Sequence, residues 1–196
     1  MTHDQTTPKT ANEPWWIVHE GHYSKELVEY GKVESRATTL RQFQPFVIPA
    51  LLQEPGYAEA LLHQYADAYP TEFIERTIEV RATRRAAFLS SDTKASFVLD
   101  ASVLRRPVGS DAIMRQQLAW LHELDSSGRA SITVMDGVYD GMEDHFSLFD
   151  VDGQVVAFAD AGKGIKQVED DDRKSELAAL FGRFQKRAAP LRDCSL

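Results

Sequence analysis

The sequence has a single cysteine and lacks long apolar runs. Cys194 is the only cysteine among 196 residues, which excludes an intrachain disulfide and a zinc site built from several cysteines. No apolar run approaches the roughly 20 residues that cross a bilayer. The first residues also lack the charged start and apolar stretch of a secretory signal. We therefore expect a cytoplasmic protein that does not enter a membrane.

Motifs for nucleotide and metal binding are missing as well. Gly162 and Gly164 lie in DAGKGIK, but the Gly-x-x-x-x-Gly-Lys-Ser/Thr pattern of a phosphate-binding loop is not there. The histidines show no His-x-x-x-His spacing. One acid-rich loop matches neither an EF-hand nor a zinc motif, so we interpret it as a solvated hairpin loop: Asp136, Asp140, Glu143, Asp144 and His145. The sequence therefore predicts no cofactor and no metal.

Positive charge is also scarce. The chain has 22 Lys and Arg against 30 Asp and Glu, for a formal net charge of -8. Such a chain repels phosphate backbones unless its basic residues gather on one face. We expect no direct contact with nucleic acid. The expected partners are a small molecule or a small partner protein, with a homodimer as a further possibility.

The remaining composition is that of an ordinary globular protein, with 43% hydrophobic and 27% charged residues. Its length fits one domain with a real core. Residues 1–13 are polar and rich in Thr, which predicts a flexible tail. We expect a single domain over residues 14–190 and a short C-terminal tail over residues 191–196.

Hydrophobic periodicity predicts an α+β fold. Helical spacing, with N-caps at Ser24, Thr71 and Ser110, predicts helices over 24–37, 55–66, 71–89, 110–125 and 170–188. Strands are predicted at 95–100, 130–135, 145–151 and 154–160, with a tight turn at Asp152-Gly153. Pro45 demotes the run at 39–48 to an edge or irregular strand. We expect a mixed, mostly antiparallel sheet of about five strands, with helices on one face and one end.

Four segments together resemble the C-terminal domain of actinobacterial helix-turn-helix regulators of the antitoxin-like, WhiJ-related group, a domain of unknown function. They are FVIPALLQEPGYAEALL at 46–62, IERTIEVRATRRAAFL at 74–89, FVLDASVLRRPVGSDAIMRQQLAWL at 97–121 and HFSLFDVDGQVVAF at 145–158. Ala50, Glu54, Ala101 and Ala159 depart from that family's pattern. Only a polar tail precedes Trp15 where such regulators carry their DNA-binding part, so the resemblance implies an effector domain that does not bind DNA by itself.

The resemblance implies a stand-alone regulatory domain that senses a ligand or binds a partner. The alternative is a small-molecule enzyme of specialised metabolism, a lyase, cyclase or isomerase recruited from that domain. A closed cavity with an ionisable residue inside would favour a small-molecule site.

Arginines are the main candidates for ligand binding, because a guanidinium offers a planar fork for carboxylate or phosphate. The same arginines could instead pair with surface acids. Arg105 and Arg106 are preferred because they are expected to close a strand. Asp100 could act as a base or orient a ligand, or it could cap the next turn. The full set of candidates is Tyr57, Arg81, Arg84, Asp100, Arg105 and Arg106, with Trp15, Trp16 and Phe46 as apolar lining.

Overall fold

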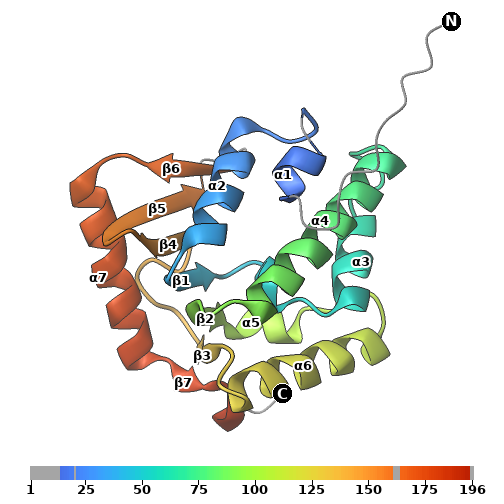
Figure 1. Ribbon diagram of the computed structural model, residues 1–196. Coiled ribbons are helices and arrows are strands. Elements are labelled where there is room, and N and C mark those ends of the chain that lie inside the picture. The colour runs from blue at the N-terminus through green and yellow to red at the C-terminus, as the bar shows by residue number, and fades with distance from the viewer. Residues whose placement is uncertain (1–13, 20, 161–163, 195–196) are drawn as a thin grey trace, which may run out of the picture.

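The computed structural model describes residues 14–19, 21–160 and 164–194, which form an α+β fold (Figure 1). The helices are α1 (Trp15–Val18), α2 (Lys25–Arg36), η1 (Ala50–Leu52), α3 (Pro55–His63), α4 (Thr71–Ser90), α5 (Ala101–Arg105), α6 (Asp111–Ser126), α7 (Asp171–Arg187) and η2 (Leu191–Asp193). The strands are β1 (Thr39–Gln44), β2 (Lys94–Asp100), β3 (Ser131–Met135), β4 (Phe146–Val151), β5 (Gln154–Asp160), β6 (Ile165–Val168) and β7 (Ala189–Pro190). Within the described ranges, no helix is long and apolar enough to span a bilayer.

The strands form one sheet in the order β6-β5-β4-β1-β2-β3-β7. β1 pairs with β2 and β2 with β3 in parallel, whereas the other four pairs are antiparallel. The expected mixed, mostly antiparallel sheet is confirmed. It has seven strands rather than about five, because β6 and β7 add short edges. With four and two residues, these edges are too short to show an alternating pattern.

Helices cover both faces of the sheet, not one face and one end as expected. α7 packs its apolar stripe, including Leu177, Phe181 and Phe184, against one face (Figure 1). The larger cluster on the other face takes buried residues from α2, α3, α4 and α6. Hydrophobic periodicity identified each helix but carries no information about the face of the sheet on which it packs.

β1 lies inside the sheet, which corrects the expectation of an edge or irregular strand. It pairs with β2 on one side and β4 on the other. The strand ends at Gln44, and Pro45 follows it. Pro45 has no backbone N–H group, but it lies beyond the hydrogen-bonded residues of β1, so the sheet loses no hydrogen bond.

Local signals for helix ends and turns are mostly confirmed. The Ser24 and Ser110 hydroxyls accept from backbone N–H groups in the first turns of α2 and α6. Asp152 and Gly153 have φ angles of 52° and 78°, as a tight hairpin turn requires. The expected cap at Thr71 is wrong, because Pro70 occupies the N-cap position of α4.

Two buried glutamines hold η1 and the start of α3 in place. Gln117 of α6 donates from Nε2 to the Leu52 carbonyl (2.9 Å), and its Oε1 accepts from the Glu54 N–H (2.7 Å). Gln53 donates to the carbonyl of Ile48 (2.7 Å). Through these contacts the chain between β1 and α3 has a fixed path, and the Gln53 side chain has a fixed direction.

Replacing Gln117 with Leu is expected to destabilise the protein. The variant leaves the Leu52 carbonyl and the Glu54 N–H without partners, at a cost of about 2–4 kcal/mol in the free energy of unfolding. Urea denaturation measures this cost. Gln116→Leu is the matched control, because Gln116 is an exposed neighbour on the same helix. Equal stability of the two variants would contradict the role of Gln117.

Candidate functional site

A cleft of about 560 Å³ lies between α1, α2 and α4. Its walls combine apolar surface from Trp15, Trp16 and Phe88 with the hydroxyl groups of several Ser and Thr residues. The whole lining consists of Pro14, Trp15, Trp16, Gly31, Glu34, Ser35, Thr83, Arg84, Ala86, Ala87, Phe88, Ser90, Ser91 and Thr93. The volume falls within the range of about 300–1,000 Å³ that is typical of small-molecule sites.

A charged pair joins α2 and α4 across this cleft. Arg84 donates from Nε to Glu34 Oε1 (2.8 Å) and from Nη2 to Glu34 Oε2 (2.7 Å), and both side chains are 12% exposed. Burial alone would lower the pKa of Arg84, but the Glu34 carboxylate outweighs it, so the pKa of Arg84 is raised. The guanidinium therefore stays protonated, and its Nε and Nη2 groups both donate hydrogen bonds to the Glu34 carboxylate.

The Arg84 side chain of this pair also lies over the aromatic ring of Tyr30. The Arg84 guanidinium lies 5.3 Å from the centre of the Tyr30 ring, and the Tyr30 hydroxyl lies 3.1 Å from Ser147 Oγ. Burial raises the pKa of Tyr30, so this hydroxyl remains neutral. Tyr30 thus connects the charged pair to β4 and the core of the sheet.

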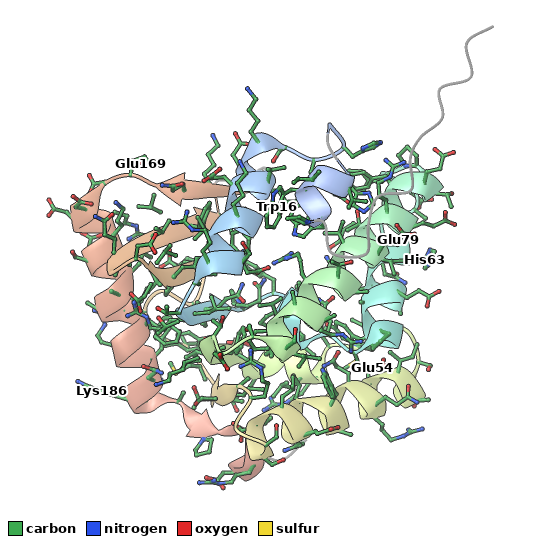
Figure 2. The ribbon with its side chains drawn as sticks, viewed as in Figure 1. Trp16, Glu54, His63, Glu79, Glu169 and Lys186 are labelled. Carbon is green, nitrogen blue, oxygen red and sulfur yellow. The ribbon has the colours of Figure 1, made fainter. Side chains whose placement is uncertain are left out.

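The short helix α1 closes one end of the cleft. The Trp15 indole packs over Gly31 so closely that a Cβ at this position would clash with Trp15 Cζ2. Trp16 meets Trp15 edge to face at a centroid distance of 5.7 Å, and it lies where α1 meets α2 (Figure 2). Gly31 is therefore the residue that lets α1 approach α2.

Arg81 lies one turn earlier on α4 and contributes to a different pocket. Its Nη1 donates to Gln53 Oε1 (2.7 Å), and none of the ion pairs among the described residues includes it. Burial and then the charge of Arg84 lower the pKa of Arg81 to about 10, so it still carries its charge at neutral pH. Tyr57 is buried nearby, and burial raises the pKa of its hydroxyl.

The other three candidates lie apart from the cleft, near the carboxyl ends of the parallel strands. Asp100 caps α5 by accepting from the Ser102 N–H (2.8 Å), and its second carboxylate oxygen accepts from the Tyr139 hydroxyl. Of the two roles open to Asp100 from the sequence, the structure shows the capping one. Burial and the hydrogen bond to Asp100 raise the pKa of Tyr139.

The expectation that Arg105 and Arg106 close a strand is wrong. The strand ends at Asp100, and α5 follows it, so Arg105 ends a short helix and Arg106 is its C-cap. Arg105 pairs with Asp136 (3.1 Å), while Arg106 donates to the Phe46 carbonyl (2.7 Å). Both arginines are exposed, and Phe46 is 45% exposed, so these three residues do not line the cleft.

The acid-rich loop connects β3 to β4, which are not neighbours in the sheet, so the expected hairpin is wrong. Its acids pair mainly with arginines. Asp144 lies 3.1 Å from Arg173, and Asp140 lies 3.6 Å from Arg183. The described part of the chain contains no group of three or more His, Cys, Asp or Glu side chains that could hold a metal ion. Gly162 lies outside the described residues.

Comparison with known proteins places the chain in a family. Residues 27–194 match the family described as "Domain of unknown function (DUF5753)". The chain belongs to the DUF5753 family. A search of curated proteins finds no match.

One solved structure similar to this DUF5753 domain is described as "Structure of TrmBL2, an archaeal chromatin protein, shows a novel mode of DNA binding". The TM-score is 0.43 at 9% sequence identity. The match covers 84% of this chain and half (50%) of the length of that one.

The sequence did not reveal the full lining of the cleft. Glu34, the partner of Arg84, lies 50 residues away in sequence. It is one of several charged residues on the amphipathic helix α2, so the sequence does not single it out. The signal that could have found it is its position: Tyr30, Gly31, Val33 and Glu34 share the inner face of α2. The structure brings the predicted residues Trp15, Trp16 and Arg84 together in the cleft.

His145 gives the DUF5753 domain a predicted pH dependence of stability. The ring lies 3.1 Å from the Gln44 side chain, and burial lowers its pKa below the ordinary value of 6.5. As the pH falls below 6.5, the unfolded chain binds more protons than the folded chain. The free energy of unfolding therefore decreases as the pH is lowered, until the pH passes the lower pKa of His145 in the folded protein. His145→Gln should reduce this slope.

Urea denaturation at a series of pH values from about 7.5 to about 5 measures the slope above and below the ordinary histidine pKa of 6.5. His63→Gln is the control, because His63 is exposed on α3 and should leave the slope of the wild type in place. A slope that is unchanged in His145→Gln and reduced in His63→Gln would contradict the assignment.

Proposed function

We propose that this DUF5753 domain is the ligand-sensing regulatory domain of an antitoxin-like regulator of the WhiJ-related type. It takes a small molecule in the cleft between α1, α2 and α4, and it does not itself contact DNA. The observation that carries this proposal is the cleft of about 560 Å³ spanned by a buried charged pair. The net charge of -8 supports the absence of direct DNA contact.

The position of the cleft suits sensing, because its two long walls rest on different parts of the fold. α2 packs over β4 and β6, whereas α4 packs against α3 and η1. The Glu34–Arg84 pair ties the two walls together. A ligand that enters between them gains contacts with both, so it favours one separation of α2 and α4 over others.

The chemistry of the walls favours a neutral ligand with an apolar body. Arg84 already donates to both oxygens of Glu34, so the pair offers no free charge of either sign. Indole and phenyl surfaces supply the apolar contacts. Ser35, Thr83 and Ser90 supply hydroxyl groups that can donate or accept hydrogen bonds.

The enzyme alternative receives less support from the same cleft. Glu34 and Arg84 are the ionisable residues among those that line it, and they neutralise each other. A general acid or base needs a proton that it can give or take near neutral pH. The raised pKa of Arg84 works against that role.

A neutral fluorescent probe tests the cleft directly. N-phenyl-1-naphthylamine should bind saturably, with energy transfer from Trp15 and Trp16, because its aromatic rings match the apolar walls. Ala87→Phe places a phenyl group in the cleft and should weaken binding at least tenfold. Ala112→Phe is the matched control on the exposed face of α6, and it should bind the probe as the wild type does.

Equal probe affinity in Ala87→Phe and Ala112→Phe would contradict a site in this cleft. Metabolites that compete with the probe are then incubated with the protein and analysed by mass spectrometry. A sensor returns each metabolite unchanged. A stoichiometric excess of a converted product would instead establish the lyase, cyclase or isomerase alternative.

A further inference from the structure

Arg81 is a charged side chain held inside the fold by a neutral partner. Its Nη1 donates to Gln53 Oε1 at 2.7 Å, and the ion pairs of the described residues leave it out. Its cationic neighbour on the same helix, Arg84, is already neutralised by Glu34. Since a guanidinium has five N–H donors, most donors of Arg81 are available to another acceptor.

The side chain cannot easily swing away to find a carboxylate in solvent. Gln53 is buried, and it is fixed by its own hydrogen bond to the Ile48 carbonyl (2.7 Å). The hydrogen bond from Arg81 to this immobile amide orients the guanidinium plane. A charge taken out of water and held in place is costly unless an anion faces it.

Arg81 lines a small pocket of about 90 Å³ between η1, α3 and α4. The pocket lies on the face of α4 formed by Ile78, Arg81, Ala82 and Arg85, whereas Thr83, Arg84 and Ala87 face the large cleft. The other lining residues are Ala50, Gln53, Pro55, Ala58 and Glu59. Two arginines therefore contribute to one pocket on the side of α4 away from the sensing cleft.

The size of the pocket limits what it can hold. Its volume of about 90 Å³ is less than a fifth of the volume of the large cleft, which is about 560 Å³. This is room for an anionic head group and not for a nucleotide or a coenzyme. A carboxylate or phosphate group matches the fork of a guanidinium.

One carboxylate, that of Glu59, already contributes to the pocket wall. Glu59 is exposed, and its Oε1 lies 3.9 Å from His63 Nε2 on the next turn of α3. Figure 2 shows Glu54 at the beginning of α3 and His63 at its other end. Glu59 is thus a competing charge at the rim, and the two arginines outnumber it.

The geometry points to an oxyanion-binding site in this pocket, in which Arg81, oriented by Gln53 and assisted by Arg85, takes a small free carboxylate or phosphate. The site is separate from the cleft of the proposed function and does not depend on it. α4 lies between them, so the two sites can be tested one at a time.

The test uses acetate and inorganic phosphate as probes, each titrated against the protein in a buffer with chloride as the only other anion. Isothermal titration calorimetry is expected to show saturable binding of at least one probe to the wild type. Arg81→Met should weaken that binding at least tenfold. Arg81→Lys keeps the charge without the fork and should retain an intermediate affinity. The stronger probe identifies carboxylate or phosphate as the natural group.

Three controls make the outcome decisive. Arg115→Met removes an exposed arginine from α6 and should leave probe affinity unchanged. Arg85→Met provides a second variant of the pocket should Arg81→Met fail to fold, and it too should weaken binding. All pocket variants should still bind N-phenyl-1-naphthylamine, which separates failure of this site from failure of the sensing cleft.

Three results would overturn the proposal. The first is the lack of saturable binding of either probe to the wild type, and the second is binding that Arg81→Met and Arg115→Met weaken equally. The third concerns Glu59→Gln, which should tighten binding by removing a competing carboxylate. If probes bound only to Glu59→Gln, Glu59 would be the natural counterion of the pocket, and no external anion would be needed.

Discussion

The bidentate contact between Glu34 and Arg84 is the interaction on which the cleft depends. It joins two helices with different neighbours, since α2 packs over β4 and β6, and α4 packs against α3 and η1. Both side chains are 12% exposed, so each charge relies on the other for most of its stabilisation. Loss of one partner from a buried pair typically costs about 3–5 kcal/mol, because the remaining charge is left without compensation.

Two arginines on one turn of the helix α4 have different kinds of partner. Arg81 and Arg84 are three residues apart and therefore lie on neighbouring parts of the helix surface, yet Arg84 pairs with α2 and Arg81 bonds to the residue that follows η1. Arg84 is neutralised by a carboxylate, whereas Arg81 is oriented by an amide. This difference separates a cleft whose two charges neutralise each other from a small pocket whose positive charge no ion pair among the described residues neutralises.

The buried glutamines explain how a loop can support such a pocket. Gln117 satisfies backbone groups on both sides of Gln53, and Gln53 in turn directs Arg81. These contacts link α6, η1 and α4 through a chain of hydrogen bonds whose geometry is fixed by burial. The segment between β1 and α3 is therefore held by side-chain hydrogen bonds from Gln53 and Gln117.

Features that depend on near neighbours were predictable from the sequence, and features that depend on distant pairing were not. The caps at Ser24 and Ser110 and the turn at Asp152-Gly153 follow from local chemistry, and all three are confirmed. Whether Pro45 weakens the strand depends on the residue at which the strand ends. β1 ends at Gln44, directly before Pro45, and hydrophobic periodicity does not locate a strand end to within one residue. Arg105 and Arg106 were misplaced because the five-residue helix α5 follows β2 without any break.

The most direct test of the account is a double-mutant cycle on Glu34 and Arg84, measured as free energy of unfolding in urea. Glu34→Leu and Arg84→Met should each cost about 3 kcal/mol, and the double variant should cost clearly less than their sum, because it leaves no uncompensated charge. Single costs that add to within about 0.5 kcal/mol would show that the two residues act independently. That result would contradict the claim that this pair holds α2 and α4 together around the cleft.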